Sequence, residues 1–237
     1  MPFKLENQSI NLVWIAPLSP DLFTPNWFKQ FDLLRDEDVE EAKVTLSEDK
    51  LLVDFGWLEL KAEPNRLTLK LAKVGLEQTY IDLIVSVFSL LKTIPTAAIG
   101  LNTNFFYSFS EREQWDKIGN ELVPKFLWSE ENKSQILQDD VEYHYGMKRL
   151  DIEIANSNRN EKDAYNEVIN LTLLPKLNFE KIPFGLVVNF NHNLRSTIEP
   201  DSIELTELIP SLFKNQFRNA ADNDILTIES IFNRILS

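Results

Sequence analysis

The chain of 237 residues has no cysteine, only two histidines and only six glycines. Without cysteine there can be no disulfide, no thiolate nucleophile and no cysteine-ligated zinc or iron–sulfur centre. The glycines never fall into a G-x-G-x-x-G or G-x-x-x-x-G-K-[ST] spacing, and there is no G-x-S-x-G motif. These shortages exclude the common phosphate-binding loops and the best-known nucleophile motif.

Long apolar runs and an excess of basic residues are also missing. The most apolar region, 81–91, is interrupted by polar residues and is too short to span a bilayer. The first residues contain no apolar stretch of signal-peptide length. The 37 acidic residues outnumber the 24 basic ones, and the net charge of −13 disfavours direct binding to nucleic-acid phosphates or to an anionic membrane. We therefore expect a cytoplasmic protein whose partner is basic or neutral.

The spacing of the apolar residues predicts an α+β fold. Residues 51–94 read as an antiparallel hairpin followed by an apolar helix over 76–92, in which Tyr80 and Phe88 recur at helical spacing. A change of parity at Gly56 predicts a β-bulge or a break in the first of these strands. We expect a predominantly antiparallel sheet with the helices packed on one of its faces.

The order of the expected elements repeats along the chain. Residues 1–95 read as a strand, a helix, three strands and a helix, and residues 96–237 repeat this order before one further helix. In the second part, Pro175 and Pro183 are expected to separate two of the strands. The pattern predicts two tandem β-α-β-β-β-α units within one compact domain.

The strand expected over 97–109 has the most regular alternation in the chain. Ile99 and Leu101 share one face, and Gly100 and Asn102 share the other. Together with the element order and the length, this stretch resembles a sporadically distributed bacterial family of uncharacterised proteins, which typically has glycine-leucine-arginine-tyrosine in this strand. Here asparagine stands in place of the arginine. The resemblance implies no activity, cofactor or partner.

Two groups of residues could bind a metal and carry out hydrolysis. Asp54, Glu59 and Lys61 follow the arrangement of metal-dependent nucleases, in which two carboxylates hold Mg²⁺ and a lysine stabilises the developing charge. Asp151 and Glu153 share a strand face and could bind a divalent cation. Solvated outward positions of a sheet also account for both groups. A metal-dependent phosphodiesterase or nuclease is therefore an alternative hypothesis and not the leading one.

The two histidines are His144 and His192. Either could act as a general base or a metal ligand, but no HxH, HExxH or HxxE spacing surrounds them. We predict a structural role for both, and no bound metal or other cofactor.

Four aromatic residues favour a role in protein interaction. Trp14, Trp57, Phe106 and Trp128 are expected at outward positions, and aromatic residues are enriched at protein interfaces. A second layer of helices that covers them is the alternative. The acidic charge and the lack of catalytic motifs lead us to predict a non-enzymatic protein that binds another protein or itself, such as an adaptor, inhibitor, antitoxin or immunity factor in a bacterial defence or toxin system. A third hypothesis is an acidic inhibitor that mimics DNA.

Overall fold

The computed structural model describes residues 2–136, 146–155, 165–197, 199 and 202–237. The first part of the chain contains β1 (Phe3–Ile15), η1 (Pro20–Phe23), α1 (Pro25–Gln30), α2 (Asp36–Glu40), β2 (Lys43–Ser47), β3 (Lys50–Asp54), β4 (Leu58–Glu63), β5 (Arg66–Leu71) and α3 (Glu77–Leu90). The second part contains β6 (Ala98–Phe109), α4 (Arg112–Leu122), η2 (Lys125–Leu127), α5 (Glu130–Ile136), β7 (Leu150–Ala155), β8 (Tyr165–Phe179), β9 (Ile182–Ser196), α6 (Glu204–Asn215) and α7 (Ala220–Leu236).

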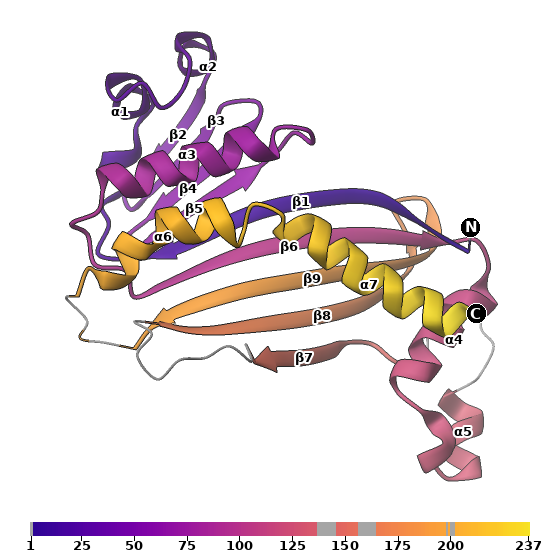
Figure 1. The fold of residues 1–237 in the computed structure, drawn as a ribbon. Helices are drawn as coiled ribbons and strands as arrows, with labels where there is room; N and C mark the ends of the chain where they lie inside the picture. The colour runs from indigo at the N-terminus through magenta and orange to yellow at the C-terminus, as the bar shows by residue number, and fades with distance from the viewer. Residues whose placement is uncertain (1, 137–145, 156–164, 198, 200–201) are drawn as a thin grey trace.

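The described strands form one nine-stranded antiparallel sheet in the order β2-β3-β4-β5-β1-β6-β9-β8-β7. Strands β1 and β6 lie side by side near its centre, and each has the last strand of its own part of the chain on its other side. Helices α3, α6 and α7 lie across one face of the sheet (Figure 1). The structure confirms the predicted α+β class, with helices packed on an antiparallel sheet. Among the described helices, none is both long and apolar enough to cross a membrane.

The first part has four strands after its short helices, not three, because residues 51–61 do not form one strand. The chain reverses at Gly56, so that Asp54 on β3 lies directly opposite Glu59 on β4. Gly56 has a φ of +82°, a conformation that favours glycine, and its N–H donates to Asp54 Oδ1 at 2.8 Å. The change of parity predicted at Gly56 is therefore explained by a tight turn that separates two strands, β3 and β4.

Strands β8 and β9 are each 15 residues long and run through both prolines that were expected to separate them. Pro175 pairs with Leu186, and Pro183 lies beside the turn that joins the strands. Strand β7 pairs with β8 only as far as Leu173. Beyond that point β8 has one described neighbour, so it tolerates a residue that has no N–H.

Helix α3 is the apolar helix predicted from the sequence, and it is covered on more than one side. The side chains of Tyr80, Ile84 and Phe88 are completely buried. The Tyr80 hydroxyl donates to the Leu69 carbonyl of β5 at 2.7 Å, which fixes the helix against the sheet. Helix α6 packs along the other side of α3.

The buried side chains form two hydrophobic clusters on the helix side of the sheet. One lies under α3 and α6, and the other lies under α4 and α7. Strand β6 passes through both, since Leu101 belongs to the first cluster and Phe105 to the second.

The prediction that Trp14 faces outward is wrong. Its side chain has no exposed surface, and its ring centroid lies 4.4 Å from that of Phe88 on α3. The indole Nε1 donates to Thr96 Oγ1 at 2.9 Å, and Thr206 on α6 donates to the same hydroxyl at 2.8 Å. The polar atom of the indole thus has a partner inside the core, which is what allows the tryptophan to be buried there.

The same prediction is wrong for Trp57, which is 7% exposed, and right for Trp128, which is 48% exposed. Phe106 lies on the outward side of its strand, as predicted, but is only 8% exposed. The Trp57 carbonyl accepts a hydrogen bond from the N–H of Ala72, which extends the β4–β5 pairing by one residue. The indole of Trp57 is buried in the first hydrophobic cluster. Phe106 faces away from the helices but is covered by Phe179, whose ring packs edge-on against it. Short-range alternation did not show that the β8–β9 turn would cover this position.

Candidate functional site

A row of polar side chains crosses all nine described strands on the face of the sheet turned away from α3, α6 and α7. Residues paired across neighbouring strands share a face, so the row follows from the strand register. From β2 to β7 it consists of Lys43, Asp54, Glu59, Lys70, Asn11, Asn102, Asn191, Asn170 and Glu153. None of these residues is buried. We call this side of the sheet the polar face.

At its centre the polar face has a ladder of asparagine amides. Asn191 Nδ2 donates to Asn102 Oδ1 at 2.7 Å, and Asn102 Nδ2 donates to Asn11 Oδ1 at 2.9 Å. Two residues further along the strands, Asn189 Nδ2 donates to Asn104 Oδ1 at 2.6 Å. These five residues are the amide ladder. The bonds hold the amides in fixed orientations, and each Nδ2 retains a second N–H that can meet an outside partner.

Strand formation does not explain these asparagines. Asparagine is depleted in β-strands, where β-branched residues such as threonine fit better. Nevertheless, β1, β6, β9 and β8 place asparagine repeatedly on the polar face. These residues are Asn7, Asn11, Asn102, Asn104, Asn166, Asn170, Asn189, Asn191 and Asn193. Strand propensity alone therefore does not account for the composition of the polar face.

One end of the polar face borders a groove of about 530 Å³ that contains the residues of the nuclease hypothesis. Asp54 and Glu59 lie on neighbouring strands, but Glu59 binds Lys70 at 3.0 Å and Lys61 binds Glu63 at 2.7 Å. The carboxylate of Asp54 accepts the N–H of the adjacent turn. Each of these three side chains thus already has a hydrogen-bond or ion-pair partner within the protein. In the described part of the chain, no group of three or more metal-ligating side chains is found.

The other end of the polar face has the second acidic pair. Asp151 and Glu153 share this face, as predicted, opposite Thr172 and Asn170. Arg149 hydrogen-bonds to Asp151, and the Thr172 hydroxyl donates to the same carboxylate at 2.6 Å. These two bonds lower the pKa of Asp151 below its usual value. The carboxylate is therefore held by its neighbours and stays charged at neutral pH.

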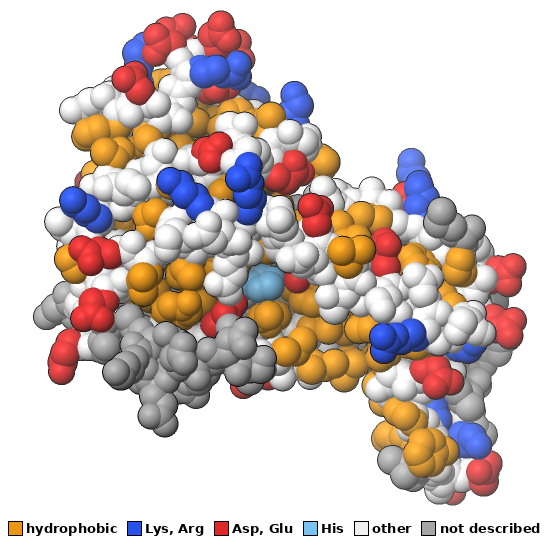
Figure 2. All heavy atoms as spheres, in the orientation of Figure 1, with side chains coloured by type: hydrophobic (Ala, Val, Ile, Leu, Met, Phe, Trp, Pro, Cys, Tyr) orange, Lys and Arg blue, Asp and Glu red, His pale blue; other side chains and the backbone are white. Residues whose placement is uncertain are grey.

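His192 belongs to a polar cluster on the opposite, helix side of the sheet. Its Nε2 lies 3.0 Å from Asp224 Oδ2 on α7, and the Thr103 hydroxyl donates to the same oxygen at 2.5 Å. His192 is 8% exposed and Asp224 is 5% exposed, and the histidine is visible at the surface in Figure 2. The Thr103 hydroxyl donates its hydrogen bond to Asp224 and not to His192. Thr103 and His192 therefore do not form a pair of nucleophile and general base. The cluster ties β6 and β9 to α7. His144 lies outside the described residues.

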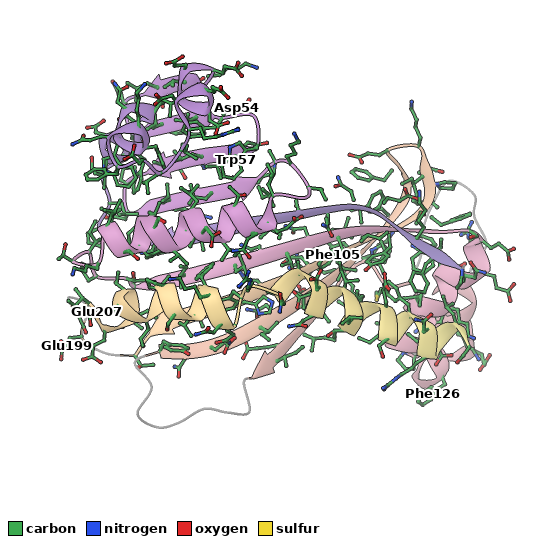
Figure 3. All side chains as sticks on the ribbon, turned by 45° about the horizontal axis from the view of Figure 1, so that its top comes forward. Asp54, Trp57, Phe105, Phe126, Glu199 and Glu207 are labelled. Atoms are coloured by element: carbon green, nitrogen blue, oxygen red, sulfur yellow. The ribbon has the colours of Figure 1, made fainter. Side chains whose placement is uncertain are left out.

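Trp128, the one exposed member of the four predicted aromatics, lies on a projecting arm. The arm consists of η2 and α5, and it extends from the end of the sheet where α4 lies (Figure 1). Phe126 on the same arm is 76% exposed and points away from the body of the molecule (Figure 3). Phe126 lies beyond the end of α4, which ends at Leu122.

Comparison with known proteins does not identify the site. No protein-family model matches the chain, and no curated protein matches it in sequence. Sequence reasoning placed Asn102 on the side of its strand opposite Leu101, as observed, but did not recognise the amide ladder. The available signal was asparagine at alternate positions of two strands, because Asn189 and Asn191 repeat the spacing of the first pair.

Proposed function

We propose that this chain is a non-enzymatic protein-interaction module that binds another protein through the polar face of its sheet. The amide ladder is the observation that supports this function best. Its amides are half-buried, neutral and oriented by their mutual bonds. They lie on the face that the large helices leave uncovered (Figure 1).

The chemistry of the ladder suits a protein surface better than a phosphate. An asparagine side chain offers an NH2 donor group and a carbonyl acceptor, the same two kinds of group that a peptide offers. It has no charge to neutralise a phosphate, and the chain as a whole has a net charge of −13. A protein partner with exposed polar groups is therefore the preferred ligand.

The ladder is organised before binding. Immobilising a flexible side chain at an interface costs about 0.5–1.5 kcal/mol, and amides that already hold each other avoid much of that cost. Nine strands about 4.8 Å apart span roughly 40 Å, which is wide enough for an interface of ordinary size. The charged residues at the two ends of the face would then orient the partner.

The competing hypotheses have less support. The carboxylates proposed for a nuclease are paired with lysine or with the backbone, as described above. A DNA mimic requires rows of negative charge, whereas Lys43 and Lys70 stand among the acids of the polar row. In the preferred proposal the protein acts in the cytoplasm as an adaptor, inhibitor, antitoxin or immunity factor, and a chain without cysteine suits that compartment.

The proposal is tested by removing the amides and measuring partner binding. Asn102→Thr with Asn191→Thr removes the centre of the ladder and leaves good strand residues in its place. Asn223→Thr with Asn233→Thr is the matched control, because both asparagines are exposed on α7, on the other side of the molecule.

Proteins captured from the native host by the tagged chain are purified, and their affinity is measured by calorimetry. We expect the ladder variant to bind at least tenfold more weakly and the control to bind like the wild type. Equal loss in both variants, or no loss in either, would contradict the proposal.

A further inference from the structure

Strand β2 forms one edge of the sheet and is exposed along its whole length. Val44 and Leu46 lie opposite Val53 and Leu51 on β3, which are each 2% exposed, yet they are themselves 51% and 68% exposed. Natural proteins usually protect an edge strand with proline, a bulge or an inward charge. Strand β2 has no proline, pairs with β3 without a register shift, and has its one charged residue at its end. This edge is therefore open to another strand.

The β2–β3 hairpin determines which backbone groups of β2 point away from the sheet. Ser47 and Lys50 are the paired residues next to its two-residue turn, and residues in that position form a hydrogen-bonded pair. Alternation along the strand then directs the backbone of Thr45 toward β3 and the backbone of Val44 and Leu46 away from the sheet. The free edge thus presents two N–H groups and two carbonyls, at the same residues whose apolar side chains are exposed.

We propose that β2 pairs antiparallel with β2 of a second copy, about a two-fold axis at Thr45, so that two sheets become one. In this register Val44 of each copy lies opposite Leu46 of the other, and each such pair exchanges two N–H···O bonds. All four outward backbone groups of each copy are satisfied, and the exposed apolar side chains meet on the helix side. Lys43 lies opposite Ser47, so no like charges face each other within the paired residues of β2.

The other edge of the sheet does not offer the same match. Strand β7 exposes Ile152 and Ile154, each at 39%, but Asp151 and Glu153 alternate with them. Antiparallel self-pairing about Ile152 would place Asp151 opposite Glu153, and pairing about Glu153 would place two glutamates together. Like charges directly opposite each other destabilise a strand pair. A second copy is therefore expected at β2 and not at β7.

The dimer should be weak and should strengthen with salt. Five residues from each copy bury less area than a stable interface needs, so we expect a dissociation constant in the micromolar to millimolar range. Acidic α2 precedes β2, and Glu48 and Asp49 form the turn that follows it. Antiparallel pairing brings these acidic ends near each other, and salt screens their repulsion.

If the polar face binds a protein as proposed, the dimer presents two amide ladders side by side, but the pairing itself does not depend on that function.

Sedimentation of the full chain from about 1 μM to about 1 mM, at low and high salt, tests the dimer. We expect self-association that salt strengthens. Val44→Lys with Leu46→Lys should weaken it at least tenfold. The same exchange at the β7 edge, Ile152→Lys with Ile154→Lys, is the matched control and should change nothing. A wild type that stays monomeric throughout, or a dimer that only the β7 variant weakens, would overturn the inference.

Cross-linking tests the register directly, because the natural chain has no cysteine. Two Thr45 residues across the axis form a pair without hydrogen bonds, whose Cα atoms lie about 4.5 Å apart, within disulfide range. Mild oxidation should therefore link a Thr45→Cys variant into dimers. In the same register the two Lys43 residues of the dimer lie far apart, so a Lys43→Cys variant should stay unlinked. Equal linking of both variants would contradict the proposed register. Neither assay involves the amide ladder, so failure of the pairing and failure of the proposed function are distinguishable.

Discussion

The two faces of the sheet use the same strands for different purposes. On β6, Leu101, Thr103 and Phe105 face the helices and are at most 2% exposed, whereas Asn102 and Asn104 face the other way and stay half-buried. The backbone is common to both faces, so the contrast lies in the side chains alone. The helix side supplies most of the apolar burial that stabilises the fold, and the polar face supplies oriented hydrogen-bonding groups.

This contrast makes a general prediction for substitutions. Changes on the helix side should lower the free energy of unfolding and spare any binding that the folded protein retains. Changes on the polar face should spare stability and weaken binding. Variants on each side test this prediction, and Gly185→Ala tests the place where the polar face also contains a buried aromatic residue, Phe106.

The largest effect is expected from Trp14→Ala on the helix side. The substitution empties a site with no exposed surface, removes the contact with Phe88 and leaves Thr96 without its indole donor. Truncating a large buried aromatic residue costs about 3–5 kcal/mol, and urea unfolding followed by circular dichroism measures it. Trp14→Phe keeps a ring in the site and should cost less than half as much. A loss below about 1 kcal/mol for the alanine variant would contradict the packing described here.

A somewhat smaller loss is expected from Asp224→Leu, which removes the acceptor shared by Thr103 and His192. Two buried polar groups would then lack their partner, at a cost of about 2–3 kcal/mol in the free energy of unfolding. Asp222→Leu on the same helix is the control, because that carboxylate is exposed, and it should change stability by less than about 1 kcal/mol. Equal effects in thermal unfolding of the two variants would argue against the Asp224 cluster.

Gly185→Ala tests the part of the polar face that is itself buried. A Cβ at this position would lie 2.6 Å from Phe106 Cε2, so the ring has to move. Overpacking of this kind costs about 1–3 kcal/mol, which denaturant unfolding can detect. Adding Phe106→Leu removes the clashing ring atoms and should make the glycine substitution nearly neutral in that background. If the cost is the same with either residue at position 106, the clash is not its cause.

The smallest effect on stability is expected from Asn102→Thr with Asn191→Thr. Threonine is the better strand residue, and the lost amide bonds are partly exposed, so the two changes should offset each other to within about 1 kcal/mol. The midpoint of urea unfolding measures this in the same variant whose partner binding is expected to fall at least tenfold. A large loss of stability would show that the ladder is a structural device and would remove the contrast between the two faces.

Much of the fold could be predicted because it depends on local patterns. Tyr80 and Phe88 recur at helical spacing, so the buried side of α3 could be recognised before its neighbours were known. Alternation likewise assigned Leu101 and Asn102 to opposite faces of β6. These assignments hold because the geometry of a helix or a strand is set by the residues within it.

Other features could not be predicted because they depend on distant parts of the chain. Trp14 is buried since Phe88 and Thr96 meet it in the core, and Phe106 is buried since the β8–β9 turn covers it. Prediction of outward positions from alternation alone could not anticipate what would cover them. The turn at Gly56 was recognisable as a break, but only the pairing of β3 with β4 placed Asp54 opposite Glu59.

The sequence by itself determined that the chain has no cysteine chemistry, that it is strongly acidic, and that Asn102 faces away from Leu101. It did not determine which strands would be neighbours. Asn11 and Asn102 are 91 residues apart in the chain, and Asn191 is a further 89 residues along. Only the sheet order brings β1, β6 and β9 together in register and turns separate asparagines into one amide ladder. Side-chain direction is local to a strand, whereas strand pairing is a property of the whole fold.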